Sequence, residues 1–208
     1  VGVGEAGEAG TLASSVLSAT SQDAFLTASL PGSGSYQAIL ARDQNDSLQG
    51  FFLVGDGRPD KLDGVGNLMA PSKSLFLPIV RGEHWNNTVL FISNSETQPA
   101  VVSVEVVGYD GRVTAKRDIQ LDPRLSRRIA LSDLFPANSL ARECYIHLAS
   151  DVPISGLAIL AGKLDFSSVC GQAPQGTSML WLPHFVFGRN GEDTELRFIN
   201  AQETALEA

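Results

Sequence analysis

Residues 100–121 read AVVSVEVVGYDGRVTAKRDIQL, which is two alternating runs joined by an Asp-Gly pair. In both runs every second side chain is apolar: Val102, Val104 and Val106, then Val113, Ala115, Ile119 and Leu121. A period of two puts these side chains on one face of a strand, and Asp-Gly between two such runs is a strong hairpin signal. Arg117 interrupts the apolar face of the second run. The stretch therefore predicts an antiparallel hairpin whose second strand lies at a sheet edge.

The rest of the chain continues this pattern of short apolar segments between turn residues. Further strands are predicted at 75–80, 88–93, 125–131, 144–149 and 154–160, and one short helical turn at 132–136. The segment 154–160 is apolar on both faces, which is typical of a central strand. The segment 11–20 fits a helix or a strand equally well, because it is rich in Ser and Thr. Frequent short strands between turns are the pattern of an all-β sandwich or barrel, and we favour antiparallel β-sandwiches.

The composition limits the class of protein. Of the 208 residues, 43% are hydrophobic, which is enough for a packed core. The formal net charge is −8, and such an acidic chain is poorly suited to nucleic-acid phosphates or to an anionic membrane surface. No apolar run approaches the roughly 20 residues that span a bilayer, so we expect no membrane insertion. The N-terminus has no initiating Met and no signal-peptide pattern, and we interpret the chain as a mature or excised piece.

The sequence repeats itself at an interval of about 105 residues. The segment SLFLPIV at 74–80 matches MLWLPHFV at 179–186, and VLFISN at 89–94 matches LRFIN at 196–200. Several such features match in the same order at a nearly constant spacing, which makes chance a poor explanation.

We therefore divide the chain into three parts. Residues 74–177 form a complete repeat, residues 1–73 the later part of a repeat, and residues 178–208 the opening strands of a further one. The end of the chain continues into its start, so the fold we expect is two tandem Ig-like sandwich modules, one of them split across the chain ends. The split module closes within the chain, closes in a neighbouring subunit, or is one period cut from a longer array. An incomplete sandwich exposes sheet edges, which invites strand addition. The residues expected to join units are Val1, Val3, Leu12, Leu180, Trp181, Leu182, Leu196, Phe198 and Ile199.

The sequence LWLPHFVFG at 180–188, with a following strand that ends at Asn200, resembles a repeat module of roughly 100 residues in bacterial secreted and cell-surface proteins. That module typically opens with a Pro-His-Phe segment, a Gly-Trp-Thr turn and a strand ending in Asn. In the earlier copy the pattern falls on Leu77, Pro78, Gly82, Trp85, Thr88 and Asn94. This copy departs from the pattern at Ile79, and the later copy lacks the Trp at 191–194. The resemblance implies β-sandwich modules of extracellular structural or adhesive proteins, without a known active site.

Two groups of side chains are candidates for ligand or covalent chemistry. Asp56, Asp60 and Asp63 crowd one loop, and oxygen-rich loops bind calcium. Their spacing does not match an EF-hand, so we favour solvated turn aspartates, with calcium as the ligand to expect if the loop binds one. Cys144 and Cys170 either form a disulfide, as an oxidising compartment would allow, or are two small buried side chains. We expect no other metal and no cofactor.

Residue spacing reveals no catalytic set. Cys144 and His147 are three positions apart, which puts them on opposite faces of a strand and rules out a nucleophile–base pair. Ser33 does not lie in a G-x-S-x-G elbow, and the G-x-G-x-x-G match at 2–7 has no preceding strand. No Ser/His/Asp arrangement is indicated either, and we therefore expect that the chain is not an enzyme.

These observations favour a structural or adhesive protein that is extracellular or lies on the cell surface. Its partners would be neighbouring copies or repeats of itself in a fibre or a long tandem array, joined by strand complementation. The alternative is an extracellular module that binds carbohydrate or protein through loops at one end of a sandwich.

Overall fold

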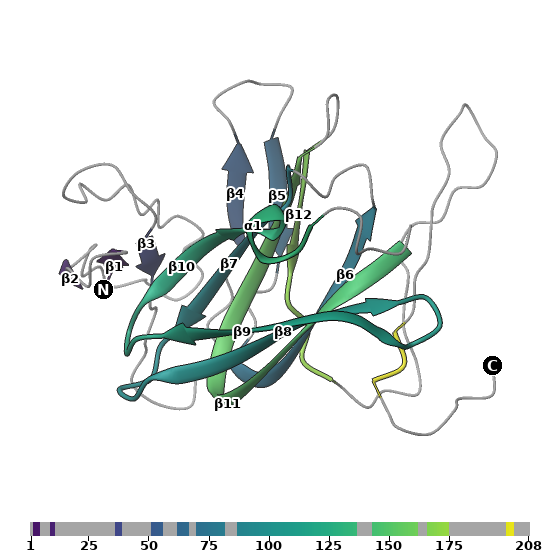
Figure 1. Ribbon diagram of the computed structural model, residues 1–208. Helices are drawn as coiled ribbons and strands as arrows, with labels where there is room; N and C mark the ends of the chain where they lie inside the picture. Colours follow the sequence, from purple (N-terminus) through teal and green to yellow (C-terminus); the bar gives the residue numbers. More distant parts are fainter. Residues whose placement is uncertain are drawn as a thin grey trace.

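The computed structural model describes residues 2–4, 9–10, 36–38, 51–55, 62–66, 70–81, 87–136, 143–161, 166–174 and 199–201. The main body consists of β6 Ser72–Arg81, β7 Val89–Asn94, β8 Ala100–Gly108, β9 Val113–Leu121, β10 Ser126–Ala130, α1 Leu131–Leu134, β11 Glu143–Ala161 and β12 Phe166–Cys170 (Figure 1). The smaller pieces are a three-stranded sheet of β1 Gly2–Gly4, β2 Ala9–Gly10 and β3 Tyr36–Ala38, and a two-stranded sheet of β4 Phe51–Gly55 and β5 Leu62–Gly66.

The fold is all-β, as the sequence predicts. Strands β6 to β12 form one seven-stranded antiparallel sheet in the order β10-β7-β11-β8-β9, with β6 and β12 also paired to β11. The sheet curls, so that its two halves face each other across a core. Within the described segments, no helix is long and apolar enough to cross a membrane.

The β8–β9 hairpin confirms the prediction made from residues 100–121. Its register pairs Ala100 with Leu121 and Val102 with Ile119, so the alternating apolar side chains lie on one face. Gly111 has a φ of 76° at the turn, a left-handed conformation that glycine adopts without strain. Strand β9 is an edge of the sheet and Arg117 is exposed, as the interrupted apolar face indicated.

Strand β11 is the centre of the sheet. The sequence predicts two strands, at 144–149 and 154–160, but the structure joins them in one strand of 19 residues. The first half of β11 pairs with β6 and β8, and the second half pairs with β7 and β12. A register shift against β6 lies between Ala149 and Ile154, where Figure 1 shows the strand bending. The Val101 N–H donates to Asp151 Oδ1 at 2.9 Å, which ties this bend to β8.

The curl is closed on one side by the chain that follows β12. Phe76 of β6 and Gln172 exchange two backbone hydrogen bonds of 2.8 Å. The Gly171 N–H donates to the Gly156 carbonyl of β11 at 2.8 Å, so three backbone segments meet closely here. A Cβ atom at Gly171 would lie 3.2 Å from the Gly156 oxygen and 3.2 Å from Leu75 Cβ, which is closer than side chains normally pack. The crossing therefore requires glycine at this position.

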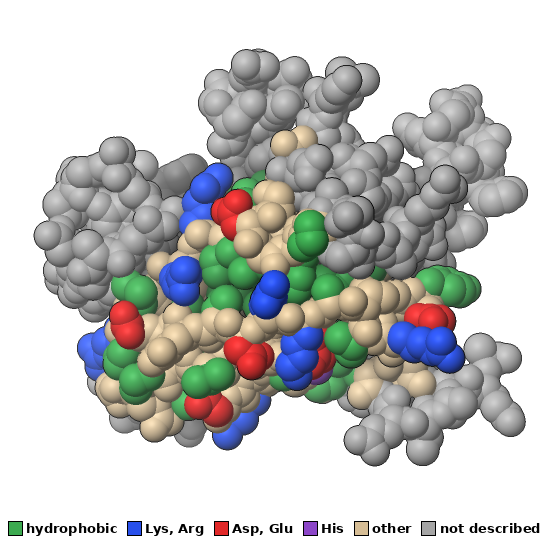
Figure 2. Space-filling model, viewed as in Figure 1, with side chains coloured by type: hydrophobic (Ala, Val, Ile, Leu, Met, Phe, Trp, Pro, Cys, Tyr) green, Lys and Arg blue, Asp and Glu red, His purple; other side chains and the backbone are tan. Residues whose placement is uncertain are grey.

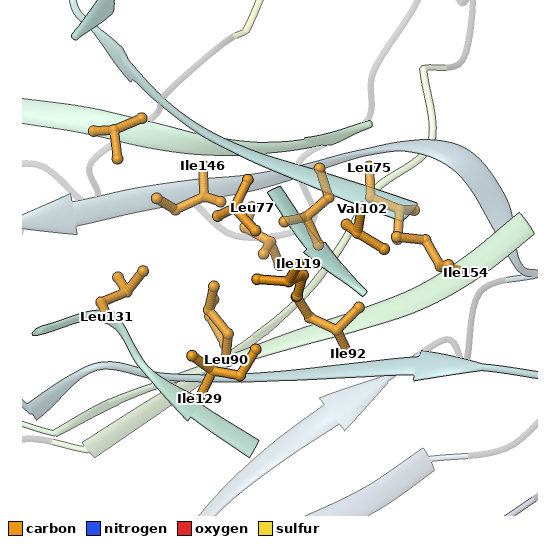
Figure 3. Close-up of a cluster of buried hydrophobic side chains, with 14 of the residues drawn as sticks. Leu75, Leu77, Leu90, Ile92, Val102, Ile119, Ile129, Leu131, Ile146 and Ile154 are labelled. Carbon is orange, nitrogen blue, oxygen red and sulfur yellow. The ribbon is translucent and has the colours of Figure 1, made fainter. Parts of the chain in front are cut away.

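The core fills the space between the two halves of the sheet. Figure 3 shows side chains from both halves pointing toward one another, among them Leu75, Leu77, Leu90, Ile92, Val102, Ile119, Ile146 and Ile154. Leu131 of α1 joins this cluster, and its N–H donates to the Thr88 carbonyl at 3.0 Å, which anchors the helical turn to β7. Burial of each such aliphatic side chain contributes about 1.5–3 kcal/mol, so the core is what holds the curl together.

Asn94 ends β7 and is fully buried. Its side-chain amide donates to the Gln98 carbonyl at 2.8 Å and to the Asp122 carbonyl at 3.2 Å. Its Oδ1 accepts from the Glu96 N–H at 2.9 Å. One side chain thus satisfies backbone groups of two loops, which gives a structural reason for a strand that ends in Asn.

Replacing Asn94 with Ala should lower the free energy of unfolding by about 2–4 kcal/mol, because buried backbone groups lose their partners. Urea denaturation of the purified protein measures this loss. Asn87 is exposed, so Asn87→Ala is the matched control and should leave the midpoint unchanged. Equal midpoints for the two variants would contradict the structural role of Asn94.

Candidate functional site

Most residues expected to join units lie outside the described segments. This group comprises Val1, Leu12, Leu180, Trp181, Leu182, Leu196 and Phe198. Val3 lies in β1, opposite Ala9 of β2 and Gln37 of β3. Ile199 is described and half-buried. The joining role of these residues therefore stays a prediction.

The calcium candidates are only partly described. Asp56 and Asp60 lie outside the described residues, whereas Asp63 lies in β5, opposite Val54. The described residues contain no group of three His, Cys, Asp or Glu side chains that could hold a metal ion.

The two cysteines are thiols in this structure, contrary to the disulfide alternative. Cys144 lies near the start of β11, opposite Gly108, whereas Cys170 pairs with Leu157 in the second half of the same strand. A disulfide needs Cα atoms within about 7 Å and suitably directed Cβ atoms, and the structure has no bond between these two residues. Burial raises the pKa of the Cys144 thiol to about 11 and also raises the pKa of Cys170, so both stay protonated at neutral pH.

An open seam separates β9 and β10, the two edges of the main sheet. Within the described segments neither edge has a further strand partner. The Arg127 guanidinium donates to the Gln120 carbonyl at 3.2 Å across the seam, so this carbonyl points away from β8. The N–H and C=O of one residue point to the same side of a strand, and the side alternates along the chain. The backbone groups of Lys116, Asp118 and Gln120 therefore face the seam.

The seam has a basic character. Residues 112–128 run along both edges and carry six Lys or Arg side chains against two Asp, in a chain whose net charge is −8. Basic side chains are spread over the described face in Figure 2, with acidic ones between them. A shallow depression of about 340 Å³ lies at the seam, lined by Gln120, Asp122, Leu125, Ser126, Arg127 and Arg128.

A second cluster lies on the outer face of the sheet, where four polar side chains from four strands form a line that we call the polar row. Lys116 Nζ donates to Glu105 Oε1 at 2.7 Å. Glu105 Oε2 lies 3.0 Å from His147 Nδ1, and His147 Nε2 lies 2.9 Å from Ser74 Oγ. The register sets this line, because Lys116 is opposite Glu105 and Glu105 is opposite His147.

Aromatic side chains flank the polar row. The Phe76 ring stacks on the His147 ring, with centroids 4.6 Å apart and planes tilted by 12°. Tyr145 lies beside Phe76, at 6.0 Å between centroids. The side chains of His147 and Glu105 are 22% and 16% exposed, so the row is shielded but reachable from solvent. The imidazole is thus held by a carboxylate, a hydroxyl and a ring.

The charged groups of the polar row shift the pKa values of Glu105 and Lys116. Burial alone would raise the pKa of Glu105, but hydrogen bonds from Lys116 and His147 and their charges outweigh it and lower that pKa. The hydrogen bond and charge of Glu105 raise the pKa of Lys116 in turn. Glu105 therefore stays ionised at neutral pH, facing both donors.

The residue spacing does not reveal this set. It excludes a pair of Cys144 with His147, and the structure confirms that these side chains lie on opposite faces, Cys144 in the core and His147 on the outside. No serine–histidine–carboxylate arrangement is evident in the sequence, whereas the structure brings Ser74, His147 and Glu105 together. Strand alternation could have placed all three on outer faces, but only the pairing register shows that they touch.

Comparison with known proteins adds similarity without a function. A family model described as "Family of unknown function (DUF5719)" matches residues 66–159, which includes β6 to β10 and most of β11. The search of curated proteins gave no match. A solved structure titled "Crystal Structure of Thermotoga maritima 1070" is 18% identical in sequence, with a TM-score of 0.42 over 52% of this chain and 100% of that chain. At that level of similarity, no property of that structure is transferred to this chain.

Replacing Glu105 with Gln should lower the free energy of unfolding at neutral pH by about 1 kcal/mol, since the amide lacks the charge that both donors face. The folded-state pKa of Glu105 is lowered, so the stabilisation is present above the unfolded pKa and is lost as pH falls through the folded pKa. The two proteins should therefore converge in acid.

Urea unfolding at a series of pH values measures this convergence. Asp133 is exposed in the first turn of α1, and Asp133→Asn is the control that should follow the wild type at every pH. If the free energy of unfolding of Glu105→Gln stayed below that of the wild type by a constant amount as the pH falls, the result would contradict the electrostatic coupling of Glu105 to Lys116 and His147.

Proposed function

We propose that this chain is a structural or adhesive module of the cell exterior, built from tandem β-sandwich repeats and joined to its neighbours by strand complementation. Its work is mechanical rather than catalytic, and it uses no cofactor. The observation that carries the proposal is the open seam, where β9 and β10 end the sheet without a described strand partner. Outward N–H and C=O groups of an edge strand are a template for an added strand.

Charge favours a particular kind of added strand. The seam is basic, whereas the chain as a whole is acidic, with 23 Asp and Glu against 15 Lys and Arg. A terminal segment of a second copy is a suitable occupant, because residues 178–208 contain Glu192, Asp193, Glu195, Glu203 and Glu207 against Arg189 and Arg197. Opposite charges steer association and set the register of the contact.

Deletion of residues 178–208 should abolish assembly, because it removes the segment that would complete a neighbour. Sedimentation velocity over a range of concentrations distinguishes single chains from polymers. A truncated protein that still polymerises would contradict the proposal that residues 178–208 join neighbouring copies. A specific hit for the intact protein on a glycan array would favour the binding-module alternative instead.

Asp118→Pro should block assembly at the receiving edge while the fold survives. Proline removes an N–H that faces the seam, and the ladder between β8 and β9 does not use that group. Asp118→Ala removes the same carboxylate but keeps the N–H, so it is the matched control and should assemble like the wild type. Normal polymer formation by Asp118→Pro, with an unchanged circular dichroism spectrum, would show that β9 is not the receiving edge.

A further inference from the structure

The polar row connects a serine hydroxyl, an imidazole and a carboxylate in the order used to activate a nucleophile. We propose that Ser74 is an activated nucleophile that accepts an acyl group from an activated ester or a thioester, which makes it a covalent attachment site. This inference goes beyond the mechanical function proposed above and does not depend on it.

The chemistry at Ser74 follows from the two hydrogen bonds of the imidazole. Glu105 accepts the Nδ1 proton, which leaves the lone pair of Nε2 directed at Ser74 Oγ, 2.9 Å away. Oγ attacks the acyl carbonyl carbon while its proton moves to Nε2. A bond forms between Oγ and that carbon, the bond to the leaving oxygen or sulfur breaks, and the leaving group takes the proton from Nε2. The products are O-acyl Ser74 and the free alcohol or thiol.

The surroundings hold the imidazole in this geometry. Phe76 stacks on one face of the His147 ring, and Lys116 fixes the far oxygen of Glu105 at 2.7 Å. Lys116 also contributes to the lowered pKa of Glu105, so the carboxylate that orients the ring stays charged. Neighbouring strands of one sheet carry these groups, and the ladder restricts their relative movement. Preorganisation of this kind is what separates an activated serine from an ordinary one.

The same face indicates which acyl donors fit. The Phe76 ring stacks on the imidazole and Tyr145 lies beside Phe76, so an apolar acyl chain or an aromatic leaving group finds apolar contact on this face. Three other described serines are placed differently: Ser93 and Ser126 hydrogen-bond each other, and the buried Ser103 hydroxyl has no partner in the described part of the chain. Selective reaction at Ser74 is therefore the signature to look for.

The test uses the full chain with 4-nitrophenyl acetate and, separately, with a fluorophosphonate probe. Release of nitrophenolate gives the rate, and intact mass with peptide mapping gives the modified residue. We expect one label on Ser74, and none on the exposed Ser167 of β12, which serves as an internal control for accessibility. Ser74→Ala should abolish labelling, and His147→Ala should slow it by about 100-fold.

Two further measurements distinguish activation of Ser74 by His147 from a loss of packing in the variants. Free imidazole should restore labelling of His147→Ala at Ser74 and have no effect on Ser74→Ala. Glu105 is a positioning residue, so Glu105→Gln should slow labelling and also change its pH dependence, which a loss of packing alone would not do. Thermal unfolding checks that each variant is folded.

Equal labelling of Ser74 and Ser167 would overturn the proposal, as would a rate that is unchanged in folded His147→Ala. Neither result tests strand complementation. Conversely, a protein that does not assemble but is still labelled at Ser74 would contradict strand complementation and leave the proposal for Ser74 intact. The two proposals therefore fail separately.

Discussion

Strand β11 is the constraint on which the rest of the structure depends. A straight strand of 19 residues would be about 60 Å long, whereas a domain of about 100 residues has a radius of gyration near 13 Å. The strand therefore has to turn back on itself, and its bend between Ala149 and Ile154 does so. Leu148 before the bend and Ile154 after it are both buried. The same face of β11 therefore points into the core on both sides of the bend, and this one strand contributes side chains to both halves of the core.

The bridge between Phe76 and Gln172 closes the curl on the side of β6 and β12. Among the described strands, β9 and β10 are the edges without a further partner. Two copies that paired β9 with β9 would bring Lys116 and Arg117 against their own counterparts, and like charges oppose that symmetric contact. An acidic strand meets no such repulsion. A contact between two different surfaces gives a ring or an open fibre instead of a two-fold dimer, and the proposed assembly is of this kind.

The sequence predicted local features well because alternation and turn chemistry are local. Residues 100–121 specified the β8–β9 hairpin, including its turn at Gly111 and its exposed Arg117. Asp151, which reads as a turn residue, instead binds the Val101 N–H and lets β11 continue through its bend. The polar row could not be predicted, since its four residues are scattered from position 74 to position 147. Only the pairing register, a property of the whole sheet, brings them together.

Strand β9 links the seam to the polar row. The backbone of Lys116 faces the seam, whereas its side chain holds Glu105 on the outer face. Lys116 therefore takes part in both surfaces of the sheet, through its backbone at the edge and through its side chain in the polar row. The alternation of a strand makes this possible, because backbone groups point along the plane of the sheet while side chains stand on its faces.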